Sequence, residues 1–325
     1  MELSCFRSHL GWAVCVLALA LLLRARRKGS WHPRMSPTDL TGKTAIVTGA
    51  NSGIGKYIAL DLARRNARTI LACRSQERGQ AAAEEIQRAT GNPQVLVRIV
   101  DTSSMASVWR FTQQIRQEEK KLHILVNNAG VAGLPFSITS EGLEQIFATN
   151  YLGHFLLTNL LLDTLKESAP ARIVNVSSFV HAGATANVKY LTGEERTNNY
   201  NHSYNSTKLM NILFANELAR RLQGTGVTAN SLNPGLVYTN IMRHFSWLVR
   251  LLFSITSLFF MSAEEGAMSA IYCAVAEEVE GITGKYFDSD CRLVLPAAAA
   301  RNPGLARKLW EESERLTGLT EGRRL

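Results

Sequence analysis

A glycine-rich turn between an apolar run and an amphipathic run constrains the fold of this chain more than any other feature. The turn reads Thr48-Gly49-Ala50-Asn51-Ser52-Gly53-Ile54-Gly55, after the β-prone residues 45–47 and before the amphipathic residues 57–65. A strand, a glycine turn and a helix in this order are typical of a phosphate-binding unit, with the glycines allowing a tight turn, a backbone approach to a pyrophosphate and close helix packing. The candidate ligand-binding residues are Gly49, Asn51, Ser52, Gly53, Ile54 and Gly55. The alternative is a turn that binds no ligand.

Strand-like and helix-like segments alternate along the rest of the chain. Strands separated by helices of ten or more residues indicate βαβ units and a parallel sheet with helices on both faces. The pattern therefore predicts one α/β domain, a Rossmann-type doubly wound parallel sheet of about seven strands. The predicted strands are 44–48, 69–72, 95–100, 124–127, 172–177, 227–233 and 285–287, and the predicted helices are 54–67, 77–90, 105–118, 140–167, 203–223 and 263–276.

A tyrosine and a lysine stand four positions apart in the run Ser203-Tyr204-Asn205-Ser206-Thr207-Lys208. Residues at this spacing share one face of a helix. An ammonium group beside a phenol favours the phenolate and lowers its pKa toward the range of an acid/base catalyst. The pattern is common by chance, but together with the glycine turn it indicates proton transfer beside a bound dinucleotide.

The ordered set of motifs resembles the short-chain dehydrogenase/reductase family over residues 40–318. It comprises TGANSGIG, VNNAG at 126–130, Asn150, Ser178, the Tyr204 and Lys208 pair, and Asn233-Pro234-Gly235. Within the family, the phrases ACRSQERG, LHILVNNAGV, NYLGHFLLT and SAPARIVNVSS resemble the microsomal NADP-dependent retinol dehydrogenase/retinal reductase branch.

The resemblance implies a role for each catalytic candidate. Tyr204 would donate or accept the proton, and Lys208 would hold the nicotinamide ribose. Ser178 would bind the substrate oxygen, with Ser177 as the alternative within the pair. Asn150 would anchor a water that links Lys208 to solvent, although the residue pattern alone favours a helix-distorting or capping role. His154, His181 and His202 lie near these motifs and are expected to be structural or solvated.

The residues after the second strand favour NADP(H) over NAD. An NAD site commonly presents a carboxylate there, whereas a 2′-phosphate needs a cation. The chain reads Leu71-Ala72-Cys73-Arg74, so Arg74 is the candidate 2′-phosphate ligand, with a solvated loop residue as the alternative. The resemblance implies further cofactor contacts at Asp101, Asn128, Ala129, Gly130, Pro234, Gly235 and Thr239.

The first 28 residues are expected to form a membrane anchor. Residues 10–23 carry no charge, and Arg24-Ala25-Arg26-Arg27-Lys28 follows them. The positive-inside rule places the catalytic domain on the cytosolic side, and the resemblance implies the endoplasmic reticulum membrane. A glycan on the sequon at Asn205 would block the site, which agrees with this side. Because the apolar run is short for a span, a surface-bound anchor is the alternative. Residues 29–39 are the expected linker and 319–325 a basic tail.

The apolar segment 241–261 indicates the class of substrate. In the resembled family an insertion here forms the substrate lid, and its apolar content suits a lipid-soluble substrate or contact with a bilayer. A core helix is the alternative. We expect interconversion of a lipophilic alcohol and its carbonyl form, with retinal and retinol as the first choice and steroid or lipid-derived carbonyls as alternatives. Tyr151 and residues 184–188 depart from the branch pattern and are candidate pocket residues.

Other partners are constrained by charge and cysteine spacing. The formal net charge of +9 is spread along the chain without a nucleic-acid-binding motif, so no nucleic-acid partner is expected. The five cysteines lack metal-ligand or disulfide-framework spacing, so neither a metal site nor a disulfide scaffold is expected. Oligomeric state stays open, and an inactive NADP-binding membrane scaffold is the alternative from a different class.

Overall fold

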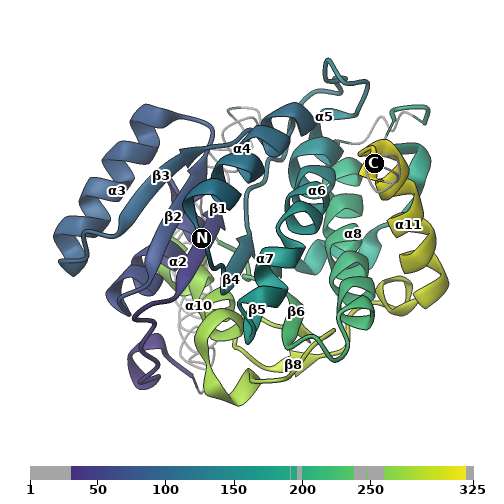
Figure 1. The fold of residues 1–325 in the computed structure, drawn as a ribbon. Helices are drawn as coiled ribbons and strands as arrows, with labels where there is room; N and C mark the ends of the chain where they lie inside the picture. The colour runs from purple at the N-terminus through teal and green to yellow at the C-terminus, as the bar shows by residue number, and fades with distance from the viewer. Residues whose placement is uncertain (1–30, 191, 196–199, 238–246, 248–259, 320–325) are drawn as a thin grey trace, which may run out of the picture.

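A mostly parallel sheet runs through the fold (Figure 1). The computed structural model describes residues 31–190, 192–195, 200–237, 247 and 260–319. Over these residues the strand order is β3-β2-β1-β4-β5-β6-β7-β8, and it reverses between β1 and β4. The strands are β1 Thr44–Thr48, β2 Arg68–Cys73, β3 Val95–Ile99, β4 Ile124–Asn127, β5 Ala171–Val176, β6 Val227–Leu232, β7 Tyr286–Phe287 and β8 Leu293–Val294.

The predicted sheet of about seven parallel strands is correct except at its edge. All seven predicted strands form, with ends that move by one residue at most. The eighth strand, β8, pairs antiparallel with β7 and was not predicted. β8 has only two residues, so the alternation of apolar and polar side chains that identifies a strand in a sequence cannot be seen. The turn that precedes β8 decides its pairing with β7.

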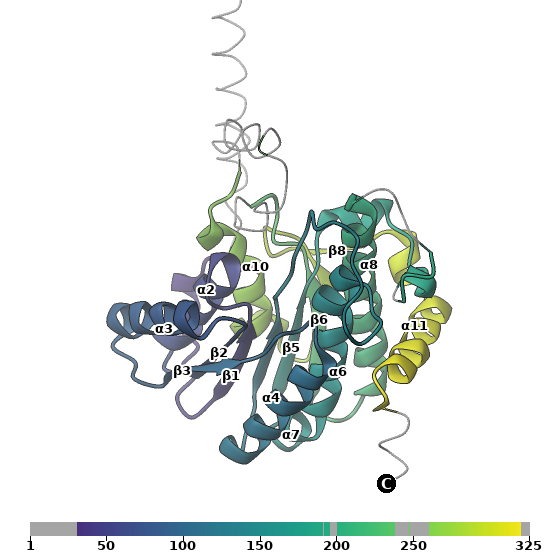
Figure 2. The ribbon, with the colours of Figure 1, turned by 90° about the horizontal axis from the view of Figure 1, so that it is seen from above.

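Helices cover both faces of the sheet, as Figure 2 shows. One buried cluster joins the sheet to α2, α3 and α10, and another joins it to α4, α6, α8 and α11. The apolar strands, such as β1, are buried on both sides, as a doubly wound sheet requires. The helices are α2 Gly53–Arg64, α3 Gln76–Thr90, α4 Met105–Glu118, α5 Gln145–Phe147, α6 Gly153–Leu160, α7 Leu162–Glu167, α8 Tyr200–Arg221, α10 Ala263–Val275 and α11 Pro303–Leu316.

The prediction of one continuous helix over 140–167 is wrong. The helical region begins after Glu144, whose carboxylate accepts from the Ile146 and Phe147 amides at 3.0 and 2.9 Å. A π-helical turn at Ala148–Leu152 then separates α5 from α6, and Leu161 separates α6 from α7. A π turn adds one residue to a helical turn and often marks a functional position; here it contains Asn150.

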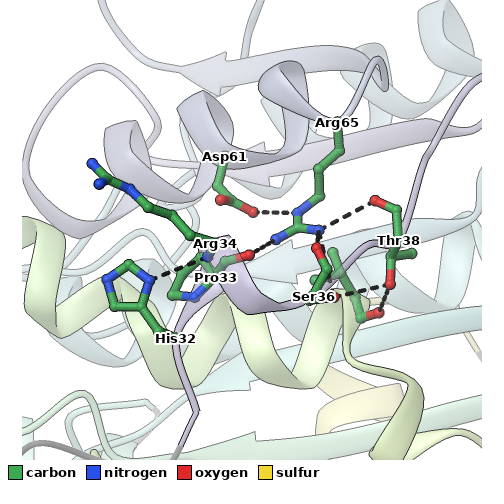
Figure 3. A network of polar contacts seen from close by, with 8 residues as sticks. His32, Pro33, Arg34, Ser36, Thr38, Asp61 and Arg65 are labelled. Carbon is green, nitrogen blue, oxygen red and sulfur yellow. Dashed lines mark hydrogen bonds and ion pairs between the residues drawn. The ribbon is translucent and has the colours of Figure 1, made fainter.

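Residues 31–40, of which 31–39 were expected to belong to a linker, pack against α2 and α10. The Trp31 ring meets the Tyr272 ring edge-on with centroids 5.1 Å apart. The Arg65 guanidinium donates to the Pro33 carbonyl at 2.6 Å and the Ser36 carbonyl at 2.9 Å (Figure 3). The segment is therefore a strap bound to the domain, and we call residues 31–40 the strap below.

Several expectations fall outside the described residues: the anchor 1–28, Thr239, most of the lid 241–261 and the tail from 320 onward. Among the helices that are described, none combines the length and the apolar character that a bilayer crossing requires.

Candidate active site

A cavity of about 270 Å³ lies at the carboxyl ends of the central strands, where the strand order reverses. This is the place where open α/β sheets bind their ligands. The cavity brings together nearly all the predicted cofactor residues that are described: Gly49, Asn51, Ser52, Gly53, Ile54, Gly55, Arg74, Asp101, Asn128, Ala129, Gly130, Tyr204, Lys208 and Pro234. Gly235 is not part of its lining.

The glycine turn allows a close approach of backbone segments. A Cβ atom on Gly55 would lie 2.5 Å from the Asn128 Nδ2 and 2.6 Å from the Gly49 carbonyl oxygen, so the helix could not start here with a larger residue. The side-chain amide of Asn128 lies in this space and donates to the Thr48 carbonyl at 2.8 Å. The first residues of α2, Gly53 to Gly55, line the cavity, and a helix N-terminus favours an anion.

Thr48 is a positioning residue that the sequence analysis did not single out. Its hydroxyl accepts from the backbone amides of Asn128 and Ala129, both at 2.9 Å, and contacts His154 Nε2 at 2.9 Å. His154 Nδ1 donates to the Asn150 carbonyl at 3.2 Å. Burial lowers the pKa of His154 to about 4, so its imidazole is neutral at physiological pH. The expected structural role of His154 is confirmed.

Two arginines lie where the second strand meets α3. The Arg74 side chain is 67% exposed and its guanidinium lies 3.9 Å from the Asp101 carboxylate. Arg78, which the sequence analysis did not single out, also lines the cavity. With the Asn51 amide oriented to satisfy its neighbours, its oxygen accepts from Arg78 Nε and Nη2 at 3.3 Å. One arginine thus lies beside Asp101 and the other is held against the glycine turn.

The four catalytic candidates come together beside this cavity. The Tyr204 side chain bonds to Ser178. Lys208 lies with Nζ 5.4 Å from the centroid of the Tyr204 ring and donates to the Val176 carbonyl at 3.1 Å. The helix α8 therefore presents the phenol and the amine on one face, as the spacing of four residues predicts.

The expected lowering of the Tyr204 pKa is wrong for the protein by itself. Burial raises the pKa of Tyr204 to about 12, and the hydrogen bond to Ser178 opposes this only in part. Burial also lowers the pKa of Lys208 to about 8. The reason is that desolvation penalises both charged forms. The Lys208 amine lies over the ring and points to a backbone carbonyl, so desolvation outweighs its attraction for a phenolate.

The structure separates the two serines that follow β5. The Ser177 hydroxyl donates to the Lys208 carbonyl at 2.6 Å, so it serves the packing of α8. Ser178 begins the 3₁₀ turn Phe179–Gly183 and bonds to Tyr204. Ser178 is therefore the serine of the pair whose side chain contacts Tyr204, whereas Ser177 is the one among the residues that line the cavity.

Asn150 lies behind the cavity with its side chain fully buried. Its Oδ1 accepts from the Val131 amide at 2.8 Å, and its Nδ2 donates to the Val131 carbonyl at 2.9 Å and to the Thr207 hydroxyl at 3.2 Å. It joins the loop after β4 to α8, one residue before Lys208. The position in a π turn fits the helix-distorting role that the sequence pattern favoured.

Asn233 connects the substrate side to the cofactor side, a role that the sequence analysis did not assign. Its Oδ1 accepts from the Phe179 amide at 3.2 Å and from the Gly235 amide at 3.1 Å. Its Nδ2 donates to the Asp288 carboxylate at 2.8 Å. The loop that follows Ser178 and the loop that contains Pro234 are therefore fixed to one side chain.

Both departures from the branch pattern place side chains against the core. Tyr151 lies in the core, where its hydroxyl bonds to Ser313 at 2.7 Å, so its predicted place in the pocket is wrong. Its ring packs on Phe155 and Phe214 instead. In the segment 184–188, Ala184 and Ala186 pack against the core.

Residues 43–247 match the family model of the short chain dehydrogenases. The chain belongs to the short-chain dehydrogenase family. It is 49% identical to mouse retinol dehydrogenase 12 over 86% of this chain and 88% of that protein. It is 48% identical to human retinol dehydrogenase 11 over 87% and 88%, and 45% identical to human retinol dehydrogenase 13 over 94% and 92%. This short-chain dehydrogenase therefore falls in the retinol dehydrogenase branch and is an oxidoreductase of CH–OH donors.

Solved structures agree with this fold. An uncharacterised protein from Mycobacterium paratuberculosis has a TM-score of 0.72 and 32% identity, over 89% of this chain and 98% of that one. The RhlG/NADP active-site complex of Pseudomonas aeruginosa has a TM-score of 0.63 and 25% identity, over 83% and 100%. A nicotinamide cofactor is supported for this short-chain dehydrogenase.

Proposed function

We propose that this chain is an NADP(H)-dependent oxidoreductase that interconverts retinal and retinol or a similar lipophilic carbonyl and alcohol. The observation that carries the proposal is that Tyr204 and Lys208 line the same cavity as the glycine turn, and that Ser178 bonds to Tyr204. A dinucleotide laid across the switch point would bring its nicotinamide to the tyrosine. The names of the relatives support the retinoid class.

The side chains have distinct tasks in the proposed reaction. A bound nicotinamide cofactor supplies or accepts the hydride. In the reducing direction Tyr204 donates its hydroxyl proton to the carbonyl oxygen, and Ser178 donates a hydrogen bond that orients that oxygen. Lys208 binds the ribose and stabilises the tyrosinate that forms. In the oxidising direction the same tyrosinate accepts the alcohol proton. Asn150 holds the loop and helix that surround Lys208.

Preference for NADP(H) is proposed from Arg74 and Arg78, the two cations at the adenosine end. Each charge-assisted bond to a 2′-phosphate is worth about 1.5–3 kcal/mol, or about 10- to 100-fold in binding. We expect Arg78→Gln to raise the KM for NADPH by about tenfold or more while changing the KM for NADH less than about twofold. Arg88→Gln, on the last turn of the same helix, is the matched control.

Steady-state kinetics with the two cofactors measure this effect. Equal losses for NADPH and NADH in Arg78→Gln would show a structural role and contradict the assignment. Because Arg74 lies near Asp101 and Arg78 lies beside Asn51, we expect Arg74→Gln to add to the loss in the double variant rather than duplicate it.

The substrate class is tested with purified enzyme, NADPH and a panel of retinal, an alkanal and a steroid ketone. The proposal expects the highest kcat/KM for retinal. If the steroid ketone alone is turned over, the substrate class is steroid carbonyls and not retinoids. Cofactor binding without turnover of any compound would favour the scaffold alternative.

We also propose that residues 1–28 anchor the enzyme in the endoplasmic reticulum membrane with the catalytic domain in the cytosol. The support is the uncharged run 10–23 with its basic flank. Asn175 begins a second sequon, Asn175-Val176-Ser177; it lies in β5 and is 1% exposed, so a glycan there would not fit the fold. Protease digestion of intact microsomes tests on which side of the membrane the catalytic domain lies. A catalytic domain that is protected from the protease would overturn the cytosolic placement.

A further inference from the structure

The strap is fixed to the catalytic domain along its length. Trp31 is 7% exposed and its ring packs on Tyr272 of α10. At the other end the Thr38 hydroxyl donates to the Val275 carbonyl at 3.0 Å, and the Leu40 amide donates to the Arg65 carbonyl at 2.7 Å. The strap therefore lies in the groove between α2 and α10 rather than spacing the domain away from what precedes it.

One buried cation holds the middle of the strap (Figure 3). Arg65, whose side chain is 8% exposed, donates to three strap carbonyls: Pro33 at 2.6 Å, Ser36 at 2.9 Å and Thr38 at 3.2 Å. Its charge is balanced by Asp61 at 2.7 Å. A buried guanidinium that loses these acceptors is left unsatisfied, so the bound position of the strap is strongly favoured.

The bound strap leaves little free chain before it. Three residue steps separate Lys28, the last residue of the basic flank, from Trp31. An extended chain covers at most about 11 Å in three steps. On the proposed function, the basic flank lies among lipid headgroups, so the beginning of the strap lies within about 11 Å of them.

The surface around the strap suits those headgroups. His32, Arg34 and Arg64 are exposed there. They border a cavity of about 340 Å³ whose walls include the apolar side chains of Leu60 and Ile271.

Three carboxylates also line this cavity. Asp61 is paired with Arg65, and Glu265 accepts from the Ser262 amide at 2.7 Å as part of a helix cap. Asp61 is therefore balanced by Arg65, and Glu264 and Glu265 are the two further carboxylates of the lining. The exposed guanidinium groups of Arg34 and Arg64 are the lining groups that can bind a phosphate here, above the apolar side chains of the cavity.

This surface adjoins the active-site edge of the sheet. Ser262, which lines the cavity, caps α10. The residue before it, Met261, donates its amide to the Leu236 carbonyl at 2.9 Å. Leu236 is 40% exposed and directly follows Gly235 in the loop after β6. The strap surface and the loop over the predicted nicotinamide position are thus neighbours.

We propose that the strap, the N-terminal turn of α10 and the end of α2 form a docking surface for anionic phospholipid headgroups. The docked strap makes the anchor a short rigid tether, and the active-site edge of the sheet faces the bilayer. A lipophilic carbonyl then passes from the membrane to Ser178 and Tyr204 without crossing bulk water.

Fluorescence quenching in proteoliposomes tests the docking. The full chain carries Cys5→Ser, Cys15→Ser and Met35→Cys, and the new thiol is labelled with bimane. Met35 is 71% exposed, whereas Cys73, Cys273 and Cys291 are buried and do not label. Gln117→Cys on the last turn of α4, on the opposite face of the sheet, is the matched control. The vesicles contain phosphatidylcholine and phosphatidylserine with bromine near the headgroup end of the acyl chains.

We expect quenching at position 35 to exceed that at position 117 by about threefold or more, since interfacial groups lie within about 10 Å of the acyl boundary. The double variant Arg34→Glu/Arg64→Glu changes no core contact, and it should remove the difference in quenching between positions 35 and 117. Arg65→Met should remove this difference as well. Equal quenching at the two positions in protein that sediments with vesicles would overturn the docking. Full quenching in vesicles of phosphatidylcholine alone would overturn the proposal that the surface binds anionic headgroups. Protein that does not sediment with vesicles would instead overturn the proposed anchor and, with it, this docking.

Discussion

Replacing Tyr204 by phenylalanine is expected to reduce kcat/KM for carbonyl reduction by about 10²- to 10⁴-fold, the range that general acid catalysis contributes. The substitution keeps the ring that packs beside Lys208 and removes only the hydroxyl that bonds to Ser178. Binding of NADPH, measured by fluorescence titration, should therefore stay within about twofold. Stopped-flow absorbance of NADPH measures the chemical step directly.

The matched control for this variant is Tyr272→Phe. Tyr272 lies on α10, and its ring contacts Trp31 and Phe287 are kept by phenylalanine. Loss of activity in both variants would indicate a general effect on the fold. A Tyr204→Phe enzyme that retains its rate to within about tenfold would show that another group supplies the proton.

Replacing Gly153 by alanine is expected to destabilise the domain by about 3 kcal/mol or more, at or above the upper end for overpacking. A Cβ atom there would lie 1.9 Å from the Thr102 carbonyl oxygen and 2.8 Å from its carbonyl carbon. Both atoms belong to the backbone before α4, so no side chain can move aside. The residue also ends the π turn that contains Asn150.

Urea denaturation followed by circular dichroism measures this loss. The matched control is Gly183→Ala, because a Cβ atom on Gly183 would meet nothing within 4 Å. We expect its free energy of unfolding to change by less than about 0.5 kcal/mol. Similar midpoints for the two variants would mean that α4 and α6 are less closely packed than the structure shows.

The parts of the fold that follow local patterns could be predicted from the sequence. β1 and the glycine turn are adjacent in the chain, and the apolar run, the glycines and the amphipathic helix each indicate the same unit. The Tyr204 and Lys208 pair needs only the geometry of one helix. The prediction of one helix over 140–167 failed because tertiary contacts, such as the approach of Gly153 to Thr102, override helix propensity.

Features that depend on distant segments could not be predicted. Arg78 becomes a cofactor candidate only because α3 begins beside Asn51, more than twenty residues earlier. Arg65 holds a strap that begins some thirty residues before it and has no pattern of its own. The direction of the Tyr204 pKa shift depends on burial, which the spacing of two residues does not reveal.

The proposed mechanism requires that Lys208, together with the positive charge of an oxidised nicotinamide, makes Tyr204 a proton acceptor. It is tested most directly by the pH dependence of kcat/KM for retinol oxidation by NADP⁺. Because the tyrosinate is the active form in this direction, the rate should rise with pH through a pKa well below the value of about 12 that burial sets in the protein alone. In Lys208→Met this pKa should move upward. A profile with no such rise, or one that Lys208→Met leaves unchanged, would contradict the account.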